Sequence, residues 1–203
     1  MRRFLAELNK QRWDDHRYYH HSRINQTLHL GSAVSFLAAY VTVFNDPAAA
    51  ALLGWLLAMV SRQIGHFFFE PKEYDAVNRA THEHKEAIKI GYNLRRKVVL
   101  LTIWALFPAL LWAEPAFFGV FSASAGRADF IRHLSLLWLA LGFGALLFRT
   151  VQLSIQQSLL TGLVWFTKIL TDPFHDIKLY CRAPLHLLRG ELLDPLEDVV
   201  HQA

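Results

Sequence analysis

Histidine is the residue type whose number and placement stand out in this sequence. Neutral imidazole is the commonest metal ligand in proteins, and seven of the eleven histidines lie in the first 84 of 203 residues. They are His16, His20, His21, His29, His66, His82 and His84. This concentration predicts a metal site built from the first half of the chain.

Helical spacing places several of these histidines on shared faces. Residues four apart lie on one face of a helix, as His16 and His20 do, and as His21 and His29 do through Asn25. In the same way His66 precedes Glu70 by one turn. A carboxylate one turn from a histidine can orient its ring or bind the metal directly, so the spacing favours Glu70 as a catalytic or supporting residue.

Long apolar stretches are the elements that must position these side chains. A membrane-spanning helix needs about 20 mostly apolar residues, and hydrophobic residues make up 53% of the chain. The four candidate spans are residues 28–44, 47–69, 98–121 and 130–148. We therefore expect an all-α, polytopic membrane helical bundle with about four transmembrane helices plus cytoplasmic or interfacial helices. A soluble bundle of unusually apolar helices is the alternative.

The basic residues predict how the bundle is oriented. Most of the 21 Lys and Arg residues precede residue 28, lie between residues 70 and 97, or follow residue 148. Lys and Arg collect on the cytoplasmic side of membrane proteins, so both termini and the 70–97 loop are expected in the cytoplasm. The net charge of +4 then reflects topology and lipid headgroup contact, with no nucleic-acid partner. The expected location is a bacterial inner membrane, or the endoplasmic reticulum of a eukaryote.

We divide the chain into a membrane-embedded, metal-binding helical domain, 1–150, and an interfacial and cytoplasmic tail, 151–203. Residues 151–170 contain three Gln and one Lys, which favours an interfacial helix over a fifth span. The segment from 172 onward contains Pro173, Pro184, Gly190 and Pro195, which predict short helical pieces.

The first two spans form a tight hairpin, because only Asn45 and Asp46 separate them. The hairpin brings His29, at the start of one span, to the depth of His66, near the end of the other. The remaining histidines flank these two positions. The candidate metal ligands are His20, His21, His29, His66, His82 and His84.

The ligand types restrict the metal and the chemistry. Imidazole and carboxylate without thiolate suit Fe, Zn, Cu or Mn, and the single Cys181 excludes a cysteine-based zinc finger. A site at the membrane boundary suggests a lipid or fatty acyl substrate, and oxygen chemistry on an unactivated chain favours Fe²⁺ as the cofactor with O₂ as co-substrate.

Two segments resemble the motifs of a known family. Residues 19–29, YHHSRINQTLH, resemble the pattern Y-H-x-x-x-x-N-x-x-x-H, and residues 63–70, QIGHFFFE, resemble Q-x-x-G-H-x-x-x-E. Both patterns belong to the yeast 2-hydroxy fatty acid dioxygenase family of small multi-pass membrane proteins. The resemblance implies dependence on ferrous iron and removal of one carbon from a 2-hydroxy fatty acid with O₂. It also implies functional roles for His20 (or His21), His29 and His66, supported by Asn25 and Glu70.

The expected function is therefore that of an Fe(II)-dependent dioxygenase of fatty acid α-oxidation. Its expected catalytic residues are His20, His29, His66 and Glu70. Three cations near the cytoplasmic interface are candidates for binding the substrate carboxylate: Arg23, Arg62 and Lys72. Two alternatives remain open: a di-iron lipid hydroxylase or desaturase, and a non-enzymatic membrane protein that binds haem or a transition metal.

Overall fold

The computed structural model describes residues 1–70, 72–122 and 125–196 of the chain. Its regular elements are helices, and no β-strand occurs among the residues so described. The predicted all-α class is therefore confirmed.

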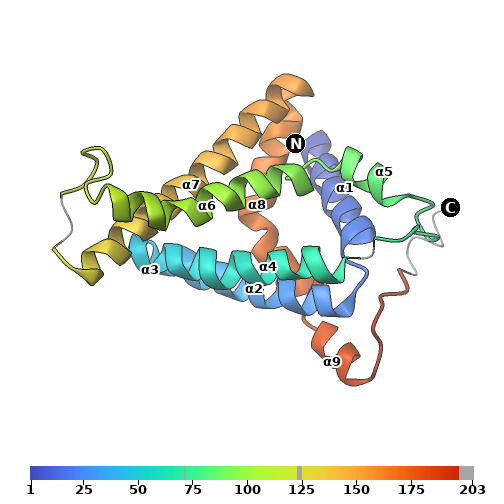
Figure 1. The fold of residues 1–203 in the computed structure, drawn as a ribbon. Helices are drawn as coiled ribbons and strands as arrows, with labels where there is room; N and C mark the ends of the chain where they lie inside the picture. The colour runs from blue at the N-terminus through green and yellow to red at the C-terminus, as the bar shows by residue number, and fades with distance from the viewer. Residues whose placement is uncertain (71, 123–124, 197–203) are drawn as a thin grey trace.

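A long antiparallel hairpin forms the centre of the fold (Figure 1). Its first arm is α2 (Arg23–Thr42). The second arm is one continuous helix, Pro47–Phe69, composed of α3 (Pro47–Leu52), η1 (Leu53–Met59), α4 (Val60–Ile64) and η2 (Gly65–Phe69). Asp46 caps this arm by accepting hydrogen bonds from the backbone N–H groups of Ala48 and Ala49, and Pro47 supplies a first helical residue with a suitable fixed φ.

The other long helices lie above and behind this hairpin in the view of Figure 1. Helix α6 runs beside the second arm, α7 crosses the bundle, and α8 packs against both α2 and α7 (Figure 1). Helices α1 and α5 lie together at one end, whereas the α6–α7 connection lies at the other. The bounds of these elements are α1 Arg2–Tyr19, α5 His82–Ile88, α6 Leu94–Ala113, α7 Arg127–Gln156, α8 Leu159–Tyr180 and α9 Ala183–Leu188.

Three helices are long and apolar enough to cross a membrane. They are Pro47–Phe69, Leu94–Ala113 and Arg127–Gln156, and they correspond to the second, third and fourth predicted spans. The predicted first span falls within α2, which is not among the three. Helix α2 buries four polar side chains, so it is less apolar than the others: Asn25, Gln26, His29 and Ser32.

The second half of the chain is more continuous than its sequence predicts. Helix α7 extends through the expected boundary at residue 150 to Gln156. The expectation of short pieces from residue 172 is wrong at its start, because α8 continues through Pro173 to Tyr180. Pro173 is buried, and the packing of α8 against α2 compensates for the backbone hydrogen bond that a proline cannot donate.

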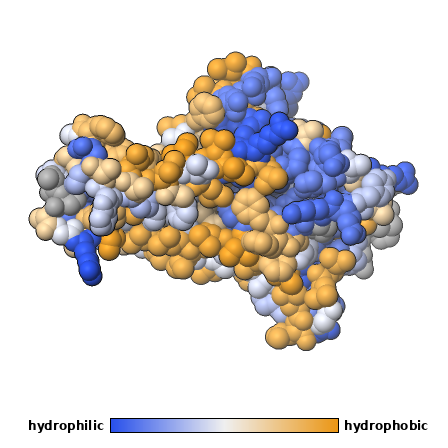
Figure 2. Space-filling model, viewed as in Figure 1, coloured by the Kyte–Doolittle hydropathy of each residue, from blue (hydrophilic) through white to orange (hydrophobic). Residues whose placement is uncertain are grey.

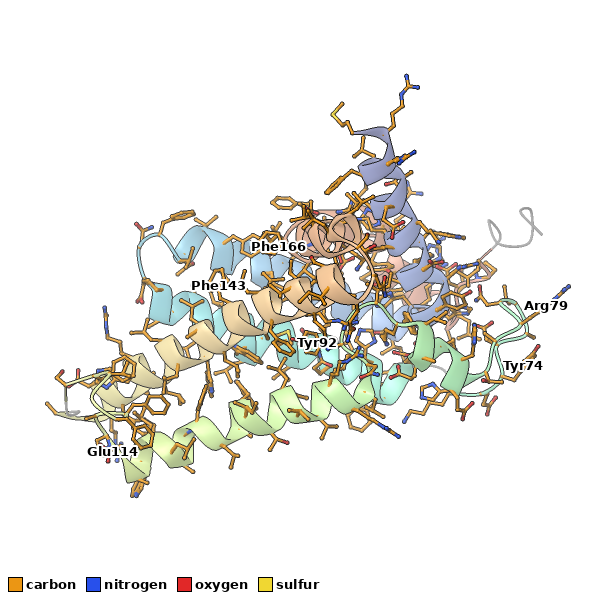
Figure 3. The ribbon with its side chains drawn as sticks, turned by 90° about the horizontal axis from the view of Figure 1, so that it is seen from above. Tyr74, Arg79, Tyr92, Glu114, Phe143 and Phe166 are labelled. Atoms are coloured by element: carbon orange, nitrogen blue, oxygen red, sulfur yellow. The ribbon has the colours of Figure 1, made fainter. Side chains whose placement is uncertain are left out.

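The polarity of the molecular surface changes along the length of the hairpin. Apolar side chains cover the middle of the bundle, and hydrophilic side chains gather over α1 and α5 (Figure 2). The side-chain view places Tyr74 and Arg79 at this hydrophilic end and Glu114 at the opposite end (Figure 3). Three of the histidines of the first half of the chain, His20, His29 and His66, approach one another near the hydrophilic end, where α1, α2 and η2 meet.

Candidate metal centre

Three histidines from three elements converge at the hydrophilic end of the hairpin. His20 follows α1, His29 lies in α2, and His66 lies in η2. One ring nitrogen from each lies within 4.8 Å of the others. The ring centroids of His20 and His29 are 4.2 Å apart, and those of His29 and His66 are 4.9 Å apart.

The chain turns sharply at His20, and side chains of α2 hold that turn. The Asn25 amide donates a hydrogen bond to the Tyr19 carbonyl (2.8 Å), and the Gln26 amide donates one to the His20 carbonyl (2.8 Å). Both amide side chains are fully buried. The end of α1 is therefore fixed against α2 by Asn25 and Gln26, which precede His29 by about one helical turn.

His66 is positioned by a π-helical segment and a carboxylate. Segment η2 has π-helical geometry, which frequently marks functional sites. Nδ1 of His66 donates a hydrogen bond to Glu70 Oε2 at 2.7 Å, which leaves Nε2 without a proton and free to bind a metal. Burial raises the pKa of the Glu70 carboxyl, and the Lys89 ammonium, 3.7 Å away, opposes this shift.

Gly65 allows the two arms of the hairpin to approach closely beside the histidines. A Cβ atom at this position would lie 2.1 Å from Asn25 Oδ1 and 3.5 Å from Cδ2 of His29. Any side chain larger than hydrogen would displace the amide that anchors the His20 turn. The glycine of the Q-x-x-G-H pattern thus has a steric role in this chain.

The triad has the properties expected of metal ligands. Both ring nitrogens of His20 and of His29 are buried and make no hydrogen bond to protein, which is costly for a buried polar group unless a ligand satisfies it. Burial lowers the pKa of His20 well below its usual range, so the ring stays neutral. A cluster with these properties could hold a metal ion.

Helix α8 supplies residues that the sequence analysis did not identify. Asp176 lies 3.9 Å from Nδ1 of His29 and forms an ion pair with Arg62. Tyr180 is buried against the rings of His20 and His29. The sequence does contain a pattern that could have identified these residues. On the largely apolar helix α8 polar side chains recur every four residues and form one face: Lys168, Asp172, Asp176 and Tyr180.

The remaining candidate histidines lie outside the triad. His21 points away, because its Nε2 contacts the Arg17 carbonyl and lies 3.5 Å from Asp75. His82 is partly buried and His84 is exposed, both at the start of α5. The structure therefore brings together three of the six predicted metal ligands.

The three cations predicted to bind the substrate carboxylate do not lie together in the structure. Arg23 forms an ion pair with Asp194 at 2.9 Å, and Lys72 is exposed. Arg62 lies near the triad, where it is paired with Asp176. These contacts leave Arg62 as the one of the three that borders the site.

A cavity of about 640 Å³ extends from His66 into the apolar middle of the bundle. Its volume is typical of sites that bind small organic molecules. Apolar side chains from the hairpin, α6, α7 and α8 form most of its wall. Among them are Phe36, Trp55, Leu100, Phe143, Leu146 and Ile169.

Compared with models of known families, with curated proteins and with solved structures, the chain has no significant match. The fold and site define the chain as an all-helical protein with membrane-compatible helices and a buried three-histidine cluster.

Proposed function

We propose that this protein is a non-haem Fe(II) dioxygenase that shortens 2-hydroxy fatty acids by one carbon. The observation that carries the proposal is the combination of three buried imidazoles, two of them without hydrogen bonds, with an apolar cavity that begins at the third. The two motifs that resemble the 2-hydroxy fatty acid dioxygenases contain all three of these histidines.

Each residue of the site has a distinct proposed role. His20, His29 and His66 hold the iron, and Glu70 fixes the tautomer and orientation of His66. Asn25 holds the His20 turn, while the apolar cavity excludes water and receives the acyl chain. The chemistry that iron(II) supplies when bound is O₂ activation together with chelation of two adjacent substrate oxygens.

A 2-hydroxy acid suits this site because its hydroxyl and carboxylate can bind one metal in a five-membered ring. Its conversion to the acid one carbon shorter, with CO₂ and water as the other products, consumes one O₂ and balances without an external reductant. A lipid hydroxylase or desaturase, in contrast, needs two electrons from a separate donor.

The arrangement of the histidines favours this proposal over a di-iron enzyme. Among the described residues the triad is the one group of three His, Cys, Asp or Glu side chains close enough to hold an ion, which fits one iron better than two, and His21, His82 and His84 lie outside it. His21 is held by Arg17 and Asp75, and His84 faces solvent.

The test is the stoichiometry of iron and the mass of the product. Purified protein should contain one iron per chain and, under O₂ without added reductant, convert 2-hydroxypalmitate to pentadecanoate. Palmitate should remain unconsumed, because it lacks the second chelating oxygen. Two irons per chain, or a hydroxylated or unsaturated product of unchanged length, would support the di-iron alternative instead.

We further propose that α2 is a fourth membrane span and that the histidine cluster faces the cytoplasm. Helix α2 has 20 residues and runs antiparallel to the apolar arm Pro47–Phe69 (Figure 1). The hydrophilic surface over α1 and α5 is where Lys and Arg concentrate, as expected on a cytoplasmic side. The specific membrane follows from the source of the chain.

Cysteine labelling should reveal this topology. In a Cys181→Ser background, Lys10→Cys and Glu73→Cys should react with an impermeant maleimide only after the membrane is permeabilised, whereas Arg127→Cys should react in intact cells. All three native side chains are exposed, so accessibility to solvent is not limiting. Labelling of position 73 from outside would contradict a cytoplasmic site.

A further inference from the structure

Five cations border the cavity that begins at His66, and they differ in whether an acidic residue neutralises them. These cations are Lys10, Arg62, Lys89, Lys97 and Lys168. Arg62 is paired with Asp176. Lys89 lies 3.7 Å from Glu70 and 3.7 Å from the centre of the Tyr19 ring, which it faces as a cation–π partner.

Of the other three, Lys168 is bound to Asp172 at 2.6 Å, and Lys10 is exposed. Lys97 is partly buried and has no ion pair within 4 Å among the residues that the structure describes. The carboxylates of Glu70, Glu86 and Asp15 act on it from beyond 4 Å. Removing an ammonium from water without a close acidic partner costs free energy, so an anionic ligand in contact with Lys97 would stabilise it.

Lys97 lies at the polar end of a cavity wall that is apolar along the rest of its length. On α6, Lys97 is followed at three and four residues by Leu100 and Leu101, which share its helical face, and all three border the cavity. The ammonium is thus at the first turn of α6, and the wall becomes apolar farther along the same face.

The second arm of the hairpin also borders the cavity, and its polarity changes in the same direction. Along the second arm of the hairpin, Trp55, Met59, Gln63 and His66 border the cavity at successive turns, so this wall changes from apolar to polar as it approaches the metal centre. Lys97 borders the same cavity as His66 and lies in the first turns of α6, which begins beside α5 at the hydrophilic end (Figure 1).

We infer that Lys97 binds the carboxylate of a fatty acid whose hydrocarbon chain occupies the cavity. The inference deepens the proposed function, on which it rests, by identifying the residue that selects an acid over a neutral lipid. A carboxylate has two oxygens, so one can contact the ammonium while the other remains available at the histidine end of the cavity.

The experiment measures binding, under anaerobic conditions, to the full-length protein in lipid nanodiscs, so that turnover does not contribute. The probes are palmitate and hexadecan-1-ol, which share one chain length and differ in the carboxylate. Lys97→Gln should weaken palmitate binding by about 10- to 100-fold, the range for losing one charge-assisted hydrogen bond. Binding of hexadecan-1-ol should change by less than about twofold.

Two further variants control for general effects. Lys97→Arg keeps the charge and should retain palmitate binding within a few-fold of the wild type. Arg95→Gln removes a cation from the same end of α6, and because Arg95 is exposed and does not border the cavity, it should leave both affinities unchanged.

Equal palmitate affinity in wild type and Lys97→Gln would overturn the inference, as would an equal loss for both probes, which would indicate a damaged cavity. Failure of both probes to bind the wild type would also overturn it. Iron content and chain shortening, measured on the same preparations, report separately on the proposed function. A protein without iron that still prefers palmitate through Lys97 would refute the dioxygenase and retain the carboxylate site.

Discussion

Replacing His29 or His66 with Ala is expected to abolish both iron binding and turnover. Each change removes one of the three histidines that the proposal assigns to the iron, and among the described residues this triad is the one group of three His, Cys, Asp or Glu side chains close enough to hold an ion. Iron per chain, measured on purified variants, should fall to background. The overall helical content should persist in both variants. His29→Ala removes no hydrogen bond from α2, and His66→Ala removes one from η2, to Glu70.

His133→Ala is the matched control. His133 lies in the second turn of α7, whose start is at the end of the bundle away from α1 and α5 (Figure 1). Its ring stacks on Phe121 with centroids 4.3 Å apart. Iron content and turnover should remain at the wild-type level. If His29→Ala and His66→Ala also kept their iron, the metal would be bound elsewhere and the triad would have another role.

The hairpin and two members of the triad were predictable because their signals are local. The Asn45–Asp46 turn and the length of the apolar segments determine that the arms run antiparallel. Once the turn is placed, His29 and His66 must lie near the same depth. A helix N-cap at Asp46 with Pro47 after it is also visible in the sequence.

The choice between His20 and His21 was not predictable from spacing. The two are adjacent, and the outcome depends on where α1 ends and how the chain turns before α2. Helix α1 ends at Tyr19, which directs His20 toward the triad and His21 toward Asp75 and Asn78. Helix ends are among the features that sequence patterns locate least well.

The contribution of α8 was missed because it depends on contacts between distant parts of the chain. Arg62 and Asp176 are 114 residues apart, and neither identifies the other by its sequence surroundings. The tail was assigned to the interface because of its polar residues, yet those on one face of α8 are buried against α1 and α2: Lys168, Asp172 and Asp176. Polar residues on an apolar helix indicated partners within the protein.

The steric role of Gly65 leads to a second large expected effect, from the addition of a single methyl group. Gly65→Ala places a Cβ atom 2.1 Å from Asn25 Oδ1, a separation that forces the amide to move. Because that amide holds the Tyr19 carbonyl, the displacement should disturb the His20 turn. We expect iron affinity to fall by about 10- to 100-fold, as for other losses of residues that orient metal ligands.

Gly31→Ala separates this effect from the general consequences of adding a methyl group to the hairpin. Gly31 also lies in α2, but a Cβ atom there would meet nothing within 4 Å. Iron affinity should be unchanged, and stability should rise by up to about 1 kcal/mol because alanine favours the helix.

A double-mutant cycle identifies Asn25 as the group that Gly65→Ala displaces. Asn25→Ala alone should weaken iron binding, since it removes the same hydrogen bond to Tyr19. In that background the Cβ of residue 65 no longer meets the amide, and the nearest remaining atom is His29 Cδ2 at 3.5 Å, which is an ordinary packing distance. Gly65→Ala should then cause little additional loss of iron affinity, whereas two independent effects would multiply. Multiplicative losses in the double variant would show that Gly65 acts through some neighbour other than Asn25.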